Sequence, residues 1–555
     1  MSRRGRRTGT DDRERRPIGP TIGLGRVALA VALSLSVAAP AARADPPRPP
    51  LPEPYATPFA RNPAERIGWP EGAKPKAVGP FQVTLWADGL GYVRWLHELP
   101  NGDVLAAEAE NVAGSGVVKL LRDADGDGRA DPAFEFLRNE AGNLNQPFGM
   151  ALVGSRLYVA NTDGLWRYPY KAGANRIAAS KGRKLLDLPS GGAGHWTRNV
   201  LASPDGRKLY VTVGSDTNAA ENGVEPPAGR AAILEYDVAR ATSRVFASGL
   251  RNPNGLGWNP VTGKLWTAVN ERDRLGDDLV PDFVTSVKKG GFYGWPYYYF
   301  GDNPDPRHAG ERPDLADATL VPDLAVGAHT SSIGLAFYTG TAFPERYRGG
   351  MFIAQHGSWN RASPVGYRVA FVPFDANGSV AGAPQPFLKG FLADRDPPTA
   401  YGRPAGVIML KDGSLLVSDD AGGRIWRIAA KGPDDGAPAL GGLMLFDAAR
   451  DKPIYPLGDG TVLDPAKLGT ARFNVVAAAS GPVGSVRFTL DGAEARVEND
   501  PPYSFAPHRV GANGRLRYDA WTPAQGVRTL VATPFSGPDA TGVAGRPVSV
   551  TFTMR

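Results

Sequence analysis

A short turn-and-strand unit recurs along most of the chain and constrains its fold more than any other feature. Each unit begins with a turn that holds Gly, often next to Asp or Asn, and continues as an alternating apolar strand with a polar end. Its six copies span residues 101–108, 154–161, 205–214, 262–270, 349–356 and 412–420. Period-two alternation of β-branched and aromatic residues between Gly, Asp and Pro is typical of β-strands.

The spacing of the copies predicts a repeat fold. Three of the five intervals between successive copies lie between fifty and sixty residues. That period indicates one blade per copy, and therefore an all-β fold with a six-bladed β-propeller over residues 76–431. We expect the apolar run from Phe81 to Trp86 to supply the strand that closes the ring with the last blade. Loops from every blade would then meet around one central mouth.

The segments on either side of the repeats differ in composition. Residues 45–75 are rich in Pro and predict an extended arm. A Pro/Gly linker lies near residues 432–436, and short strands with recurring turns follow it. The region 440–555 therefore predicts a small immunoglobulin-like β-sandwich.

The first 44 residues have the features of an export signal. An Arg-rich stretch precedes an apolar run from Val27 to Ala39, and Ala42-Arg43-Ala44 gives a small-x-small cleavage pattern. We expect this leader to be removed and the mature protein to be periplasmic or secreted. The apolar run is too short for a stable membrane span, and no later segment is long and apolar enough.

Charge and cysteine content narrow the functional class. The leader holds nine Lys/Arg and three acidic residues, so it accounts for +6 of the net charge of +7 and leaves about +1 for the mature chain. A nucleic-acid partner is therefore not expected. The chain has no cysteine, which excludes disulfides, thiolate catalysis, iron–sulfur clusters and covalent c-type haem. Any redox group must be bound non-covalently, and its electrons must pass to another molecule.

Residues 249–300 combine cations, carboxylates, tight turns and many aromatic side chains. Arg251, Arg272 and Arg274 accompany the run Gly-Gly-Phe-Tyr-Gly-Trp-Pro-Tyr-Tyr-Tyr-Phe, which ends at Phe300. Charged groups next to aromatic surface indicate a cleft for a flat, polar, anionic ligand.

Two histidine-bearing loops are further candidates. His195 lies in a Gly-rich loop before the third strand copy, where it is either a general base or a structural histidine beside Trp196. In His356-Gly-Ser-Trp-Asn-Arg361, Arg361 offers a planar fork for a carboxylate and Trp359 a stacking face. The alternative for this second loop is a tight turn with an exposed Arg.

Two acidic runs leave metal binding open. Residues 123–131 resemble the first part of a calcium loop, but Phe134 occupies the position of the closing Glu, and a solvated acidic turn is the alternative. The second run contains Asp273, Asp277, Asp278 and Asp282. It could bind calcium or pair with the nearby Arg and Lys residues.

Taken together, the ordered motifs resemble the soluble pyrroloquinoline-quinone (PQQ)-dependent sugar dehydrogenases, in particular their sorbosone dehydrogenase branch. The resemblance covers roughly residues 81–428. It rests on Gly-Gly-Ala-Gly-His195-Trp-Thr-Arg, Tyr210-Val-Thr-Val-Gly-Ser, Gly249-Leu-Arg-Asn-Pro, Asn270-Glu-Arg-Asp-Arg-Leu-Gly-Asp-Asp, Gly291-Phe-Tyr-Gly-Trp-Pro, His356-Gly-Ser-Trp-Asn-Arg and Arg403-Pro-Ala-Gly-Val.

This resemblance implies roles for particular residues. His195 would be the catalytic base, and the quinone would contact Arg251, Asn252, Arg361, Trp359 and His329. The backbone carbonyls of Glu271 and Arg272 would bind the calcium ion beside the quinone. Asp282 and Tyr293 would lie near a second, structural calcium. The chain departs from the family pattern at Gly194, where an acidic residue is common, and at Asn-Glu-Arg, which replaces Gly-Pro in the calcium turn.

The expected activity is oxidation of an aldose or related sugar to a lactone or acid, with electrons passed to an external quinone or cytochrome. Two other functions stay open on the sequence. One is a metal-dependent lactonase on a similar propeller, and the other is a propeller that binds sugar without catalysis.

Overall fold

The structure is a computed structural model that describes residues 48–124, 127–140, 142–191, 194–223, 229–431, 438–479, 482–511 and 515–555. The expected export signal lies outside these residues. Within them, no helix is both long and apolar enough to cross a membrane. In the part of the chain that the structure describes, helix is confined to four 3-10 turns and the single-turn α1 (Pro465–Leu468).

The six strand copies fall one to a blade, as predicted, and each is the second strand of an antiparallel sheet counted from the inner strand. Blade 1 contains β4 (Val93–Glu98), β5 (Val104–Glu108), β6 (Val117–Leu121) and β7 (Phe134–Arg138). Blade 2 contains β8 (Met150–Val153), β9 (Arg156–Asn161), β10 (Gly164–Pro169) and β11 (Arg183–Asp187). Blade 3 contains β12 (Val200–Ala202), β13 (Lys208–Val213), β14 (Ala232–Asp237) and β15 (Thr242–Ser248).

The remaining three blades are modified by insertions and by the N-terminal arm. Blade 4 contains β16 (Asn252–Trp258), β17 (Leu265–Asn270), β18 (Pro281–Ser286) and β21 (Leu324–Ala328). Blade 5 contains β22 (Ser332–Phe337), β23 (Met351–Gln355), β24 (Arg368–Val372), β25 (Gln385–Lys389) and the added β2 (Lys76–Ala77). Blade 6 contains β28 (Pro404–Met409), β29 (Leu415–Asp419), β30 (Arg424–Ala430) and β3 (Phe81–Ala87).

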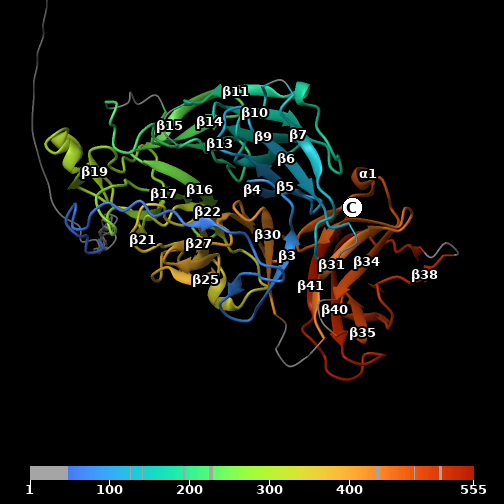
Figure 1. Ribbon diagram of the computed structural model, residues 1–555. Coiled ribbons are helices and arrows are strands. Elements are labelled where there is room, and N and C mark those ends of the chain that lie inside the picture. The colour runs from blue at the N-terminus through green and yellow to red at the C-terminus, as the bar shows by residue number, and fades with distance from the viewer. Residues whose placement is uncertain are drawn as a thin grey trace, which may run out of the picture. The chain divides into compact units, whose positions relative to one another are not determined.

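The ring closes between the two ends of the repeat region. β3, at the start of the chain, pairs antiparallel with β30 near the end of blade 6, so the blue and orange strands lie side by side in Figure 1. The inner strands also contact one another in order around the ring, from β4 through β8, β12, β16, β22 and β28 back to β4. The sequence prediction of a six-bladed propeller with a closing strand near Phe81 is therefore confirmed.

Glycines let neighbouring inner strands approach closely. A Cβ on Gly334 of β22 would lie 2.6 Å from the carbonyl oxygen of Ala405 in β28. A Cβ on Gly149, just before β8, would lie 2.3 Å from the backbone nitrogen of Val200 in β12. Since no side chain fits at these points, the backbones themselves form the wall of the ring.

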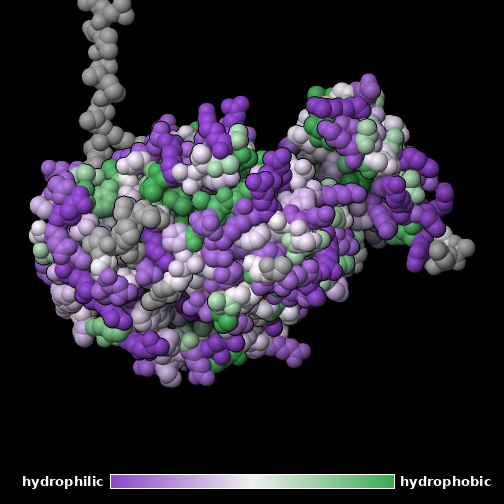
Figure 2. Space-filling view, turned by 90° about the horizontal axis from the view of Figure 1, so that it is seen from above, coloured by the Kyte–Doolittle hydropathy of each residue, from purple (hydrophilic) through white to green (hydrophobic). Residues whose placement is uncertain are grey.

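The inner strands enclose an apolar cavity of about 260 Å³, lined by residues of all six blades. Trp95, Met150, Leu256, Phe337 and Val407 contribute to its wall. His97 also lines this cavity, and burial lowers the pKa of His97 to about 4. The face of the molecule in Figure 2 is mostly hydrophilic, with apolar side chains in local groups.

Most strands after residue 438 form two larger sheets, and β38 (His508–Val510) pairs with β39 (Leu516–Tyr518) in a separate two-stranded sheet. One contains β32 (Lys452–Leu457), β31 (Leu440–Asp447), β34 (Phe473–Ala479) and β37 (Tyr503–Ser504). The other contains β33 (Thr461–Leu463), β41 (Val548–Met554), β40 (Gly526–Phe535), β35 (Ser485–Leu490) and β36 (Ala493–Glu498). Buried residues of both sheets, such as Leu445 and Phe488, belong to one apolar cluster. This is the sandwich that the sequence predicts.

The N-terminal arm is extended and is fixed to the blades by hydrogen bonds. β1 (Glu65–Arg66) pairs in parallel with β27 (Pro398–Ala400), which in turn pairs with β26 (Leu392–Arg395). Further along the arm, the Trp69 indole donates to Asp419 at 2.6 Å. The arm thus contacts loops at the strand ends of blades 5 and 6.

Candidate active site

Strand register brings the polar strand ends to one end of the ring. The first residue of an inner strand pairs with the last residue of the second strand in four blades. These pairs are Val93 with Glu108, Asn252 with Asn270, Ser332 with Gln355, and Pro404 with Asp419. We call this end of the ring the mouth.

His195 is held at the mouth by its Nδ1 atom. Nδ1 lies 2.9 Å from the carbonyl oxygen of Ser215 and 3.1 Å from its hydroxyl, which in turn donates to the carbonyl of Thr217. A carbonyl only accepts hydrogen bonds, so Nδ1 carries the proton and Nε2 keeps its lone pair. Among the described residues, none bonds Nε2. Gly214 allows this arrangement, because a Cβ there would meet His195 at 2.7 Å and Asn252 at 2.5 Å.

Arg251 is buried beside His195 and is fully engaged by the protein. Its Nε donates to the carbonyl of Asn218, and Nη1 donates to the carbonyls of Asn270 and Glu271. Nη2 donates to the side chain of Asn218 at 2.9 Å and to Asp273 at 2.8 Å. Arg251 therefore holds three loops together. It contributes positive charge to the mouth, but its nitrogens are already bonded and do not offer a free pair of donors to a ligand carboxylate.

Asp273 links Arg251 to a second histidine. One carboxylate oxygen accepts from Arg251, and the other accepts from Asn360 at 2.8 Å. His329 lies 3.6 Å from Asp273, receives a bond from Asn360 on Nδ1, and donates from Nε2 to the carbonyl of Gly276. Burial opposes ionisation of Asp273, but Arg251 and then His329 outweigh it and lower the pKa of Asp273 to about 2.

The pKa of His195 is lowered to about 3 by burial and then by Arg251, with Asp273 acting in the opposite direction.

A second charged cluster comes from blades 1, 5 and 6. Arg94 donates to Asp420 at 2.6 Å and lies over the Trp196 ring, 5.2 Å from its centroid. Asp420 also accepts from His356 Nε2 at 2.8 Å. Arg403 donates to the carbonyl of His356 at 3.0 Å. Because Trp196 follows His195 directly, this cluster and the His195 group share one mouth.

Several buried polar atoms at the mouth have no partner among the described residues. They are Nε of Arg94, Oδ1 of Asn252 and Oδ1 of Asn270. Buried polar groups are nearly always paired in folded proteins. The mouth therefore offers a guanidinium (Arg94), two amide oxygens (Asn252 and Asn270) and an indole ring (Trp196). Groups of these kinds fit a planar, polar, anionic ligand.

The other members of the predicted quinone site lie elsewhere. Arg361 donates to the carbonyl of Asp277 at 2.7 Å and pairs with Asp278 at 2.9 Å, and it lines a separate cavity that His195 does not line. Trp359 packs edge-on against Phe59 of the N-terminal arm, with ring centroids 6.0 Å apart. The expectation that Arg361 shares a ligand with His195 and Arg251 is not met in this arrangement, because its guanidinium is held by the loop at 277–278.

The carbonyls expected to bind calcium both accept hydrogen bonds here. Arg251 Nη1 donates to the Glu271 carbonyl at 2.6 Å, and the Val280 amide lies 3.5 Å from the Arg272 carbonyl. The Arg272 side chain pairs with Asp305. Within the described residues, no group of three or more His, Asp or Glu side chains is placed to hold a metal ion.

Asp282 and Tyr293, expected near a structural calcium, do not meet. Asp282, at the start of β18, accepts from the Glu271 amide, the Thr330 hydroxyl and the Ser331 amide. The Tyr293 hydroxyl donates to the carbonyl of Ser286, at the end of the same strand. Four residues of strand separate these ends by roughly 13 Å, so the two side chains cannot share one ion.

The acidic turn at 123–131 is only partly described, because Asp125 lies outside the described residues. Asp123, Asp127 and Asp131 each accept a hydrogen bond from a nearby backbone amide. These bonds match the turn that the sequence offers as one of its two explanations, and calcium binding there stays a prediction.

Sequence reasoning missed Arg94, Asp420 and the central position of Asp273. Arg94 and Asp420 are 326 residues apart in the chain and meet only because the ring closes between blades 6 and 1. The available signal was the tandem Asp419-Asp420 at the end of the sixth strand copy.

The comparisons with known proteins agree with this architecture. The TrAA12-like family profile matches residues 75–284 and 313–431, more than half of the chain. The chain belongs to the TrAA12-like family. An uncharacterized protein of Borreliella burgdorferi is 30% identical over 299 residues, which cover 52% of this chain and 76% of the relative.

Two further similarities connect the TrAA12-like chain with named dehydrogenases. A pyrroloquinoline quinone-dependent pyranose dehydrogenase of Coprinopsis cinerea is 24% identical over 343 residues, covering 51% of this chain and 46% of that protein. The solved PQQ domain of pyranose dehydrogenase from Coprinopsis cinerea, in its holo form, matches with a TM-score of 0.55 and 21% identity, over 66% of this chain and 100% of that structure. The chain thus spans less than half of the length of this curated dehydrogenase, and the structural match supports the propeller fold.

Proposed function

We propose that this protein is a PQQ-dependent sugar dehydrogenase that oxidises an aldose or a related sugar, of the sorbosone type, to a lactone or acid. One observation carries the proposal: His195 presents an Nε2 that no described residue bonds, at a mouth that also holds Arg94 over an indole ring and buried polar atoms without a partner in the described chain. The names of the relatives support the same activity.

The residues at the mouth fit the quinone in their chemistry. Pyrroloquinoline quinone is a flat tricarboxylate, and a bound quinone supplies a two-electron acceptor for hydride. Arg94 would hold a carboxylate through the part of its guanidinium that does not bond Asp420, and Asn252 and Trp196 would contact the polar edge and the ring face. Arg251 would act mainly through its charge, since its nitrogens are already bonded.

His195 would remove the proton of the sugar hydroxyl while hydride leaves the adjacent carbon. Ser215 fixes the tautomer and the direction of Nε2, so the base is oriented before substrate arrives. Asp273 favours the imidazolium that forms when Nε2 takes up the proton, because its negative charge raises the proton affinity of the ring. The mouth would thereby avoid a free alkoxide.

Calcium and cellular location complete the proposal. The Glu271 carbonyl has a second lone pair beyond its bond to Arg251, so it remains able to ligate a calcium ion at the mouth. The Arg-rich leader and small-x-small site support export to the periplasm or outside the cell. Electrons would then pass to an external quinone or cytochrome.

Reconstitution tests the proposal directly. The mature protein is mixed with PQQ and calcium, and dye reduction is assayed with a panel of aldoses and sorbosone, alongside lactone hydrolysis. The proposal expects aldose-dependent dye reduction only when PQQ is present. Lactone hydrolysis without dye reduction would replace it with the lactonase, and sugar binding without either reaction would replace it with a non-catalytic binding propeller.

A further inference from the structure

A second cavity lies between blades 4 and 5 and shares no lining residue with the His195 and Arg94 clusters. Its volume is about 670 Å³, within the range of small-molecule sites. Its wall is formed by β21, the 361–367 loop, the start of β24, the end of β25 and the β26 strand. We call it the inter-blade pocket.

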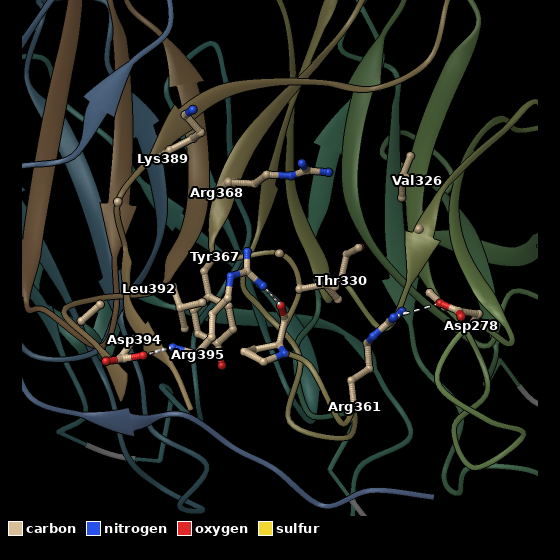
Figure 3. A pocket seen from close by; sticks show the side chains of 17 residues that line it. Asp278, Val326, Thr330, Arg361, Tyr367, Arg368, Lys389, Leu392, Asp394 and Arg395 are labelled. Carbon is tan, nitrogen blue, oxygen red and sulfur yellow. Dashed lines mark hydrogen bonds and ion pairs between the residues drawn. The ribbon is translucent and has the colours of Figure 1, made fainter. Parts of the chain in front are cut away.

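The side chains of the inter-blade pocket are predominantly cationic. Figure 3 shows Arg368, Arg361 and Arg395 directed into the same space, with Lys389 at its edge. Only two carboxylates, Asp278 and Asp394, line the same pocket. Four cations against two carboxylates leave an excess of positive charge.

The two carboxylates are already committed to other groups. Asp278 pairs with Arg361 at 2.9 Å. Asp394 accepts from the backbone amide of Arg395 at 2.6 Å, while the Arg395 side chain donates to the Pro364 carbonyl. No carboxylate within the described part of the chain pairs with Arg368 or Lys389, so their charges face the pocket uncompensated.

Arg368 is held in place by a buried amide. Its Nε donates to the side-chain carbonyl oxygen Oε1 of Gln355 at 2.7 Å, and Gln355 Nε2 donates to the Val326 carbonyl at 3.1 Å. Gln355 is fully buried. Burial also lowers the pKa of Arg368. A cation that is oriented by a buried residue, desolvated and left without an anion is the arrangement expected of a preorganised anion site.

We propose that the inter-blade pocket binds a small ligand through an oxyanion group, a phosphate or a carboxylate, which Arg368 and Lys389 contact with support from Arg395. This pocket shares no residue with the His195 and Arg94 clusters, where the quinone is proposed to bind. It also gives Arg361 a place in the wall of the pocket, where Asp278 fixes its guanidinium.

Binding to the mature protein without cofactor tests this site independently of any activity. Calorimetric titrations use inorganic phosphate, D-gluconate as a carboxylate source and neutral D-glucose. We expect one or both anions to bind, with affinity that falls as salt is added, because screening weakens charge pairing. Saturation by phosphate alone assigns a phosphate ligand, and saturation by gluconate assigns a carboxylate.

Variants locate the binding. Arg368→Gln with Lys389→Gln should weaken anion binding by roughly tenfold or more, as expected for loss of charge-assisted hydrogen bonds. Arg207→Gln with Lys264→Gln, two exposed cations outside the pocket, is the control of equal charge change and should leave binding unchanged. Lys389 is exposed, so Lys389→Gln alone tests the pocket without altering any buried residue and should leave the fold intact.

Two results would overturn the inference. One is that neither anion binds the wild-type protein. The other is that the pocket variants, including Lys389→Gln, bind the anions as tightly as the control does.

Discussion

The Ser215 carbonyl oxygen lies 2.9 Å from Nδ1 of His195. This contact fixes which nitrogen of the ring is protonated, and so it decides that Nε2 is the basic atom that faces the mouth. The low pKa of His195, about 3, keeps the ring neutral over the whole physiological range. A base with these properties is available for proton transfer without prior deprotonation.

Replacing Arg251 with Lys should destabilise the protein by about 2–4 kcal/mol, because a lysine cannot reproduce bonds from three nitrogens and would leave buried acceptors unpaired. Thermal and denaturant unfolding measure the loss. Arg274→Lys is the matched control, since Arg274 is exposed and should change stability by less than about 0.5 kcal/mol. Equal stability of the two variants would show that Arg251 does not anchor the loops.

Replacing His97 with Gln should change how stability depends on pH. The pKa of His97 is about 4 in the folded protein, below its ordinary value of 6.5. Between these values the unfolded chain binds a proton that the folded chain does not, so the wild type loses stability as pH falls from 6.5 to 4. The imidazole of His97 lines the central cavity and is half-buried, so we expect the variant to gain about 1–2 kcal/mol over the wild type across this interval. Parallel pH profiles of unfolding would contradict the assignment.

Replacing Gly334 with Ala should destabilise the ring by about 1–3 kcal/mol, because the new Cβ would press on the Ala405 carbonyl and force the inner strands apart. The control is Gly382→Ala, whose Cβ would approach only the Pro373 ring, at 3.2 Å. Chemical denaturation compares the two. A Gly334→Ala protein as stable as the control would argue against close packing of β22 on β28.

Removing the Arg94–Asp420 pair should weaken PQQ binding. The double change Arg94→Gln with Asp420→Asn avoids leaving a buried carboxylate alone, and we expect affinity to fall by roughly tenfold to a hundredfold through loss of a charged contact. Fluorescence titration with PQQ in the presence of calcium measures the affinity for PQQ. The matched control is Arg122→Gln with Asp103→Asn, another pair, at 2.6 Å, in blade 1. Unchanged affinity in the Arg94 variant would remove this cluster from the quinone site.

The sequence allowed the blades to be predicted better than the site. Alternation of apolar residues and turn residues are local signals. They located one strand of each blade, and the closing strand near Phe81, from the sequence. The partners of Arg251 could not be located in this way, because Asn218 lies in an irregular loop and meets Arg251 only after blades 3 and 4 pack. Arg361 was expected at the quinone on the basis of its motif, and the loop at 277–278 directs it elsewhere.

The measurement closest to the central claim is the turnover of His195→Ala after reconstitution with PQQ and calcium. The account predicts that the variant binds PQQ with near wild-type affinity while kcat for aldose oxidation falls by roughly a hundredfold or more, as expected for loss of a general base. His195→Ala with wild-type kcat would contradict the account.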